Sequence, residues 1–292
     1  MPRLPRWIRT DLRTDEAFRR VNAVVAREGL NTVCSSARCP NRAECWNRGT
    51  ATFMLLGSLC TRGCPFCAVP VGCPTAPDPD EPGKIAAAVL RLGLRHVVLT
   101  SVTRDDLPDG GAGHFAHTLR AIRRTSPRAT VEVLTPDFRG SEQSLARVLE
   151  SAPDIFAHNL ETVRRLTGTA RAGACYDRSL AVLRFAAAWT PAPRVKSGLM
   201  LGLGETEEEV DAALNDLVQA GCRALTLGQY LSPDPRRLPV VRFAPPEEFD
   251  RWATRARAMG FAHVASGPLV RSSYRADEFL LPAEEMLPCP AC

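Results

Sequence analysis

The 292-residue sequence lacks a hydrophobic run long enough to form a membrane-spanning helix. Its apolar segment Thr52–Leu59 is far too short for that, so no membrane role is expected. A strong excess of one charge is also missing, because 37 basic residues face 32 acidic ones and the net charge is only +5. This mild, well-mixed charge forms no basic stripe, so we expect no nucleic-acid partner, although it is compatible with an acidic protein partner.

The N-terminal sequence MPRLPRWIRTDLRTDEAF lacks the apolar stretch of a secretory signal, and we therefore expect a cytoplasmic protein. Disulfides rarely persist in a reducing cytoplasm, so the eleven cysteines are expected to be free thiols or metal ligands. A structural zinc site is disfavoured as well. Zinc prefers paired C-x2-C knuckles or nearby histidine pairs, which the cysteine groups described next do not offer.

Six of the cysteines form two triplets within 34 residues. The spacing is C-x4-C-x5-C in the first triplet and C-x3-C-x2-C in the second, and the members are Cys34, Cys39 and Cys45, then Cys60, Cys64 and Cys67. Each triplet can bind three irons of a four-iron cluster and leaves the fourth iron open to a substrate or cofactor. The pattern therefore indicates an enzyme of redox or radical chemistry rather than an electron carrier.

Strand-like and helix-like segments alternate through the rest of the chain. Strands are expected at Ala51–Gly57, His96–Thr100, Thr130–Leu134, Asp154–His158, Arg194–Met200 and Ala224–Leu227. Helices are expected at Ile85–Leu92, Phe115–Arg124, Ser141–Glu150, Asp177–Trp189, Thr206–Ala220 and Pro245–Met259. Thr206 and Glu209 are expected to form a capping box. About six βα repeats predict an α/β fold with parallel strands, either as a barrel or as an open sheet.

The C-x3-C-x2-C loop directly follows the first expected strand, which is the catalytic position in β/α barrels. Three regions are expected. Residues 1–50 form an N-terminal extension with the first cysteine triplet, residues 51–260 form the βα repeat, and residues 261–292 form a C-terminal extension. Both extensions are expected to cap the open face of the repeat.

Motifs spread over nearly the whole chain, from Trp7 to Pro282, carry a specific family resemblance. The C-x3-C-x2-C loop after a first strand resembles the radical S-adenosylmethionine superfamily, and the added C-x4-C-x5-C triplet resembles the lipoyl synthase family within it. Further matching motifs are Gly49–Met54, Thr100–Asp106, His158–Thr162, Lys196–Glu205, Leu225–Leu231 and Ser266–Tyr274, the last with Arg-Ser-Ser-Tyr. The resemblance implies a partial (βα)6 TIM-like barrel with N-terminal and C-terminal capping extensions.

The resemblance implies two 4Fe–4S clusters with different tasks. The cluster on the second triplet binds S-adenosylmethionine and cleaves it to a 5′-deoxyadenosyl radical, whereas the auxiliary cluster on the first triplet is consumed as the sulfur donor. In this family a serine oxygen of Arg-Ser-Ser-Tyr is a weak fourth ligand of the auxiliary cluster. The family pattern points to Ser273, with Ser272 as its rival, and Arg271 is expected to help release Ser273.

The implied activity is a sulfurtransferase reaction that inserts two sulfur atoms, at C6 and C8, into an octanoyl chain on a lysine of a lipoyl carrier domain. The expected partners are the octanoylated glycine cleavage H protein or 2-oxoacid dehydrogenase E2, with flavodoxin or ferredoxin as reductant, and the sequence does not choose among them. One alternative is another radical S-adenosylmethionine enzyme that inserts sulfur into a free small molecule or RNA. Another is an iron–sulfur scaffold or redox sensor, which the full βα repeat argues against.

Contacts to S-adenosylmethionine are expected at the ends of strands. Gly202 lies in the glycine-rich segment Gly198–Glu205, which resembles the adenosine-contacting segment of the superfamily, although a tight strand-to-helix turn explains its glycines equally well. The other candidates are expected at or near the carboxyl ends of strands, where they could reach cofactor or substrate: Thr100, Asn159, Glu161 and Lys196.

The remaining cysteines and histidines have plainer interpretations. His96 and His158 are expected in polar networks rather than at a metal, because a lone histidine lacks partner ligands. Cys175 and Cys222 are expected to be buried small side chains. The Cys289-Pro-Ala-Cys292 pair does not belong to the family pattern and stays open as a redox pair, a metal clip or a tail.

Overall fold

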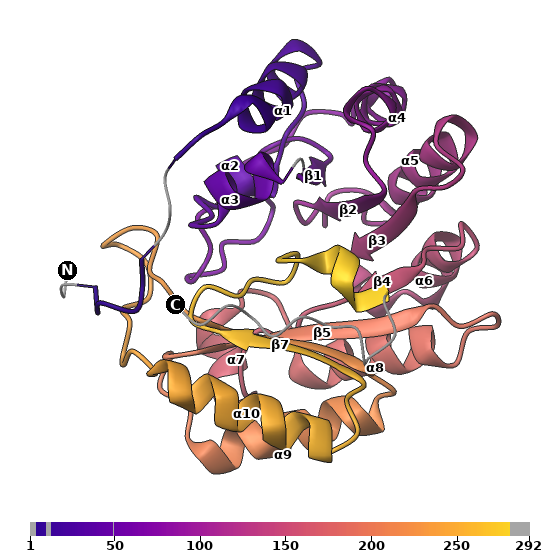
Figure 1. Cartoon of the computed structure of the whole chain (residues 1–292). Helices are drawn as coiled ribbons and strands as arrows, with labels where there is room; N and C mark the ends of the chain where they lie inside the picture. Colours follow the sequence, from indigo (N-terminus) through magenta and orange to yellow (C-terminus); the bar gives the residue numbers. More distant parts are fainter. Residues whose placement is uncertain (1–3, 10–12, 49, 281–292) are drawn as a thin grey trace. The chain divides into compact units, whose positions relative to one another are not determined.

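The structure, a computed structural model, describes residues 4–9, 13–48 and 50–280 and alternates strands with helices (Figure 1). The strands within these residues are β1 (Thr52–Leu55), β2 (His96–Ser101), β3 (Thr130–Leu134), β4 (Ile155–Ala157), β5 (Arg194–Leu201), β6 (Ala224–Gln229) and β7 (His263–Gly267). They follow one another in chain order, and the pairs β1–β2, β2–β3, β5–β6 and β6–β7 are parallel. Parallel strands in chain order are typical of β/α barrels, and the predicted α/β class is confirmed.

The chain divides into two compact units, which we describe separately. The N-terminal unit contains residues 11–63 and 68–156, and the C-terminal unit contains residues 1–10, 64–67 and 157–292. Helices of the N-terminal unit are α1 (Glu16–Arg27), α2 (Val33–Ser36), α3 (Arg42–Asn47), α4 (Glu81–Leu92), α5 (Ala112–Thr125), α6 (Glu142–Leu149) and the short 3-10 helix η1 (Phe138–Gly140).

The core of the N-terminal unit lies between its strands and helices α4 and α5. Alternating residues of β2 and β3 are fully buried, and so is one face of α5, whose apolar residues are spaced by three or four positions. These residues are Val97, Leu99, Val131 and Val133 on the strands and Phe115, Leu119 and Ile122 on the helix. Burial of each such side chain stabilises the fold by about 1.5–3 kcal/mol relative to exposure.

The C-terminal unit contains α7 (Arg164–Ala170), α8 (Tyr176–Ala187), α9 (Glu207–Gln219), α10 (Pro246–Ala258) and the 3-10 helix η2 (Ala276–Leu280). The predicted capping box is confirmed at the start of α9, where the Thr206 hydroxyl accepts from the Glu209 N–H and the Glu209 carboxylate accepts from the Thr206 N–H. Gly221, with a φ angle of 86°, lies just after the end of this helix, where a left-handed backbone conformation favours glycine.

Some elements are absent from the sequence-based prediction for identifiable reasons. Helices α2 and α3 have four and six residues, too few for a helical period to be recognised. Strand β7, in the predicted C-terminal extension, has the sequence His-Val-Ala-Ser-Gly, with little of the β-branched and aromatic content that marks strands. The division at residues 50 and 260 stays a prediction, and Cys289 and Cys292 lie outside the described residues. In the described part of the chain, no helix combines the length and hydrophobicity that crossing a bilayer requires.

Candidate active site

The beginning of the C-x3-C-x2-C loop is held at its base by backbone hydrogen bonds within the N-terminal unit. β1 is followed by Leu56 and Gly57, whose positive φ angles of 69° and 91° turn the chain sharply. The Cys60 N–H then donates to the Pro70 carbonyl at 2.9 Å, and the Cys60 carbonyl accepts from the Gly72 N–H at 3.1 Å. These two hydrogen bonds join the two ends of the loop, and Cys60 is its first residue.

Arg62, two residues into the loop, ties it to the chain after β2. The Arg62 backbone N–H donates to Cys60 Sγ at 3.3 Å. Its guanidinium donates to both oxygens of Asp105, at 2.6 and 2.9 Å, and to Asp137 at 2.8 Å. The Thr61 hydroxyl adds a bond to the Thr103 carbonyl at 3.0 Å. The loop is therefore held by an arginine with two carboxylate partners, not by its cysteines alone.

The Thr100–Asp106 motif is thus a support for the cysteine loop, a role that sequence reasoning did not assign to it. Arg104 is almost fully buried and donates to the Leu56 carbonyl at 3.3 Å, to the Thr75 carbonyl at 2.9 Å and to Asp106 at 2.8 Å. Thr100 is buried in β2, and its hydroxyl donates to the Leu134 carbonyl of β3 at 2.9 Å. Thr100 as a contact of the cofactor stays a prediction.

The first cysteine triplet lies on two short helices of the N-terminal unit. Cys34 is on α2, Cys45 is on α3, and Cys39 lies between the helices. Burial, followed by the nearby Cys34 and Cys39 thiols, raises the pKa of Cys45 well above its usual range. Trp46 packs on Phe18 of α1 with ring centroids 5.1 Å apart, so α1 covers the helix that carries Cys45. The three predicted ligands are therefore brought within electrostatic reach of one another.

The donor set is chemically suited to iron–sulfur clusters. None of the nine cysteines among the described residues forms a disulfide, including the six of the two triplets. Within residues 4–9, 13–48 and 50–280, no three His, Cys, Asp or Glu side chains already surround a single point as the ligands of one metal ion would. Cluster cysteines bind different irons of one core, so their sulfurs need not converge on one point. That these residues bind clusters stays a prediction.

In the C-terminal unit, Asn159, Glu161 and Ser272 form a hydrogen-bonded group. The Asn159 amide donates to Ser272 Oγ at 2.5 Å and to Glu161 Oε1 at 3.0 Å. Glu161 has a positive φ of 67° and pairs with β5, its N–H donating to the Gly198 carbonyl at 2.9 Å. Burial raises the pKa of Glu161, and the charge of Arg171, the Asn159 amide and Arg271 offset part of that rise.

The segment after β7 runs along one face of β5, β6 and β7 (Figure 1). Ser266 Oγ donates to the Phe249 carbonyl of α10, so side chains at alternate positions of β7 point away from that helix. On this opposite face, a Cβ at Gly228 would lie 2.1 Å from the Val270 carbonyl oxygen, and one at Gly198 would lie 3.3 Å from Ser272 Oγ. Two glycines thus give the Arg-Ser-Ser-Tyr segment room to approach the strands.

Lys196 lies elsewhere than expected. It is the third residue of β5, near the amino end of the strand rather than its carboxyl end, and it is fully buried. Its ammonium lies 4.2 Å from the centre of the Phe279 ring in η2, a cation–π contact, and His263 packs on the same ring. The expectation that Lys196 lies at the carboxyl end of its strand is therefore wrong, and its cofactor role stays a prediction.

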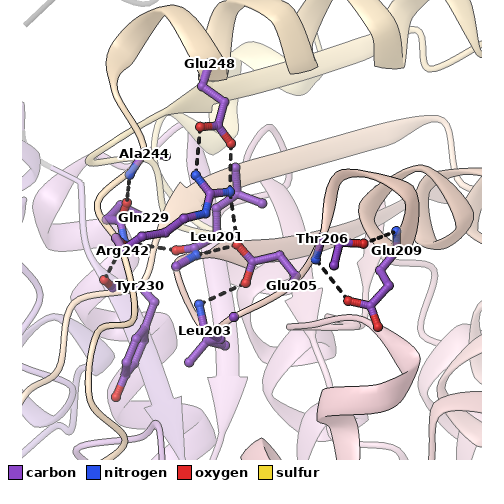
Figure 2. Close-up of polar contacts among 12 residues, drawn as sticks. Leu201, Leu203, Glu205, Thr206, Glu209, Gln229, Tyr230, Arg242, Ala244 and Glu248 are labelled. Atoms are coloured by element: carbon purple, nitrogen blue, oxygen red, sulfur yellow. Dashed lines mark hydrogen bonds and ion pairs between the residues drawn. The ribbon is translucent and has the colours of Figure 1, made fainter.

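The turn from β5 to α9 is organised around the buried carboxylate of Glu205 (Figure 2). This carboxylate accepts the Gly202 N–H at 2.6 Å and the Leu203 N–H at 2.9 Å, and the Arg242 guanidinium lies 3.4 Å away. Arg242 also forms a bidentate ion pair with Glu248, at 2.7 and 2.8 Å. The carboxylate therefore fixes two consecutive amides of the glycine-rich turn.

Gln229, at the end of β6, adds hydrogen bonds around the same turn (Figure 2). We call Glu205, Arg242 and Gln229 together the clamp of the glycine-rich turn. Its amide nitrogen donates to the carbonyls of Leu201, Tyr230 and Arg242, each at 3.0 Å, and its oxygen accepts the Ala244 N–H at 2.8 Å. Gly202 has a φ of 102°, and a Cβ there would lie 2.2 Å from the Gln229 amide nitrogen. The turn geometry by itself requires glycine at this position, and a cofactor contact at Gly202 stays a prediction.

The other site candidates have mixed outcomes. His96 and His158 lie in polar networks as predicted, 2.8 Å from Thr130 Oγ1 and 3.0 Å from Ser179 Oγ. Cys222 is fully buried as predicted, but the prediction of a buried Cys175 is wrong, because this residue precedes α8 on the exposed surface. The Ser273 hydroxyl has no hydrogen bond within the described residues, in contrast to Ser272. Arg271 donates to the Val270 carbonyl at 2.7 Å.

Comparison with known proteins identifies the class of this chain. The model of the Radical SAM superfamily matches residues 54–217, more than half of the chain. Solved structures share the fold at low identity. The peptide-bound SuiB of Streptococcus suis has a TM-score of 0.55 at 11% identity, over 83% of this chain and 58% of that one. Methylornithine synthase has a TM-score of 0.50 at 14% identity, over 75% of this chain and 61% of that one. The chain is a member of the radical SAM superfamily.

Curated relatives narrow the assignment. The lipoyl synthase of Symbiobacterium thermophilum is 54% identical over 94% of this chain and 86% of its own length, and that of Methylococcus capsulatus is 55% identical with the same coverage. The lipoyl synthase of Thermus thermophilus is 52% identical over 96% of this chain and 88% of its own length. Within the superfamily, the chain belongs to the lipoyl synthase family.

Proposed function

We propose that this protein is a lipoyl synthase, an iron–sulfur sulfurtransferase that inserts two sulfur atoms, at C6 and C8, into a protein-bound octanoyl-lysine. The observation that carries the proposal is identity of 52–55% to lipoyl synthases over at least 94% of the chain. Both cysteine triplets support it, since an enzyme that only cleaves S-adenosylmethionine needs one open-iron cluster and not two.

In this proposal, Cys60, Cys64 and Cys67 hold one 4Fe–4S cluster, and the first cysteine triplet with Ser273 holds the other. When bound, S-adenosylmethionine and the two clusters supply the radical that activates the octanoyl carbons and the sulfur that those carbons receive. The side chains of the protein supply position and shielding. Arg62 and Arg104 hold the second triplet's loop to the chain after β2, so that Cys60 is presented from a fixed base.

The choice of Ser273 as the fourth ligand is supported by the state of its neighbour. Ser272 Oγ already accepts a hydrogen bond from Asn159, whereas the Ser273 hydroxyl has no such bond within the described residues. A hydroxyl without a protein partner is available to iron. An oxygen ligand is harder than a thiolate and less suited to a cluster iron, which fits a cluster that must come apart to give up sulfur.

The proposed substrates are octanoylated carrier domains of the glycine cleavage H protein or 2-oxoacid dehydrogenase E2 type, with flavodoxin or ferredoxin as the source of electrons. We further propose that the reaction takes place in the cytoplasm. Residues 1–50 would carry the sulfur donor, residues 51–260 the radical machinery, and residues 261–292 the serine ligand.

The test is an anaerobic assay of the reconstituted protein with octanoylated carrier, S-adenosylmethionine and dithionite. We expect about eight irons per chain, because two four-iron clusters are proposed. We also expect a carrier mass increased by two inserted sulfurs. Cys39→Ala should keep cleavage of S-adenosylmethionine and lose sulfur insertion, whereas Cys64→Ala should lose both. A carrier that gains no sulfur, or equal loss of cleavage in both variants while each keeps its other cluster, contradicts the proposal.

Ser273→Cys is the sharper variant. A thiolate in place of the hydroxyl should bind iron more tightly and hold the auxiliary cluster intact. The expected protein carries full iron and cleaves S-adenosylmethionine but forms no lipoyl product. Ser272→Cys is the matched control, and wild-type yield from Ser273→Cys with loss in the control would assign the ligand to Ser272 instead.

A further inference from the structure

The net charge of the whole chain is mild, but its positive excess is concentrated in the first fifty residues, so the charge is less evenly mixed than the totals for the whole chain suggest. Residues 1–50 contain ten arginines, no lysine and only five acidic residues, a net charge of +5. The whole chain also has a net charge of +5, so residues 51–292 are neutral as a group. An excess of this kind is a property of one segment and not of the overall composition.

Helix α1 displays three of these ten arginines. Arg19, Arg20 and Arg27 are exposed on this helix, and none has a carboxylate partner within the described residues. Glu16, at the amino end, is the only acidic residue in α1. In contrast, exposed Arg91 on α4 is paired with Glu28. Arg19, Arg20 and Arg27 are therefore a surface of unpaired positive charge, which we call the α1 basic surface.

The α1 basic surface lies on the helices that carry the predicted sulfur-donor triplet. Phe18 of α1 packs on Trp46, the neighbour of Cys45, and the Asn47 side chain accepts the Asp15 N–H at 3.1 Å. The opposite face of α1 is buried through Val21 and Val24. The α1 basic surface therefore lies on the solvent-exposed side of a helix that packs against α3, which carries Cys45.

We propose that the α1 basic surface is the docking site for the octanoylated carrier domain, and that the carrier binds it through an acidic patch around its octanoyl-lysine. This inference rests on the proposed function. The octanoyl chain must reach the sulfur donor, so a surface beside the first triplet suits the substrate. An electron donor must instead serve the second triplet. Exposed unpaired arginines raise the rate of encounter with an acidic partner and contribute through long-range attraction.

The test reverses these charges and uses a matched control. The variant Arg19→Glu/Arg20→Glu/Arg27→Glu changes the net charge by six, and so does Arg120→Glu/Arg124→Glu/Arg128→Glu, which alters exposed arginines on and after α5. Binding of a fluorescent octanoylated carrier to reconstituted enzyme is measured by anisotropy without reductant. KM is then measured with dithionite, so that no protein electron donor is involved. An uncharged octanoyl-lysine peptide serves as a second substrate.

We expect the α1 variant to weaken carrier binding and raise the carrier KM at least about tenfold at low salt, while the α5 variant stays near wild type. The difference should shrink at 0.5 M salt, because screening shortens the reach of charge. Turnover of the peptide should be unchanged in both variants. Unchanged carrier binding in the α1 variant, or equal weakening in the α5 variant, overturns the inference.

Two outcomes separate this inference from its alternatives. If the α1 variant binds carrier normally but accepts electrons poorly from reduced flavodoxin, the surface serves the reductant and the inference is wrong. If wild-type enzyme converts neither carrier nor peptide, the proposed function fails, whereas normal peptide turnover with unaltered carrier binding counts against the docking surface alone.

Discussion

Replacement of Glu205 tests whether a buried carboxylate organises the glycine-rich turn after β5. The carboxylate accepts the N–H groups of Gly202 and Leu203 at 2.6 and 2.9 Å, and its side chain is only 1% exposed. Glu205→Ala leaves both amides without an acceptor in a buried site. An unsatisfied buried donor costs about 1–3 kcal/mol, so the two together predict a loss of about 2–6 kcal/mol in the free energy of unfolding. Arg242 keeps its partner Glu248, so no unpaired charge adds to this loss.

The control for Glu205 lies four residues further along the same chain. Glu209→Ala removes the carboxylate half of the capping box and the ion pair with Arg165, but both are exposed, and the cost should be only about 1 kcal/mol. Glu205→Gln, which keeps one acceptor oxygen, should fall between the two. Urea unfolding of the protein gives all three values. If Glu205→Ala is no more destabilising than Glu209→Ala, the clamp does not stabilise the turn.

The same variants test the predicted cofactor contact at Gly202. If the turn contacts S-adenosylmethionine, its loosening should weaken binding of that cofactor at least about tenfold, equivalent to about 1.4 kcal/mol. Glu209→Ala should bind the cofactor as wild type does, because it leaves the amides of Gly202 and Leu203 in place. Equal cofactor affinity in Glu205→Ala and wild type, measured by equilibrium dialysis, would remove Gly202 from the predicted contacts.

Three further outcomes are expected. Burial raises the pKa of Glu161 above its ordinary value of 4.5, so the folded protein holds this proton more tightly than the unfolded chain. Stability should therefore fall as pH rises above that value, and Glu161→Gln should flatten this part of the stability–pH profile measured by urea unfolding. Gly228→Ala places a methyl group 2.1 Å from the Val270 carbonyl and should expose the segment after β7 to limited proteolysis, an effect that unaltered cleavage would contradict. Burial raises the pKa of Cys222 to about 12, so iodoacetamide at pH 8 should modify exposed Cys175 and leave Cys222 unmodified until the protein unfolds, as peptide mass mapping can check.

The α/β class could be predicted because its signals are local. Apolar strand segments such as Thr130–Leu134 are bounded by polar turns, and the Thr206–Glu209 capping box lies within one helical turn. Short elements were harder, because α2 has only four residues and no period can be read from it. The class of a fold is therefore easier to predict than the elements of its extensions.

The chemistry of the site could be predicted from the sequence only where the residues involved lie close together in the chain at a recognisable spacing. Each cysteine triplet is compact in the chain, so its members are recognisable from the sequence alone. The clamp of the glycine-rich turn joins Glu205 to Arg242, 37 residues away in the sequence. No local sequence pattern predicts a pair of residues so far apart. The position of Lys196 has a different explanation. Lys196 is the third residue both of the predicted strand Arg194–Met200 and of β5, so its expected place near the carboxyl end did not follow from the predicted bounds.

The serine pair illustrates how structure adds to a motif. In sequence, Ser272 and Ser273 are equivalent neighbours, and either could be a cap, a turn residue or a ligand. In the structure, the Asn159 amide donates a hydrogen bond to the Ser272 hydroxyl, and Gly198, which has no side chain, leaves room for this contact. The glycine, the asparagine and the first serine together hold the segment against β5 and β6. The Ser273 hydroxyl makes no such bond within the described residues, so the structure distinguishes the two serines although they are neighbours in the chain.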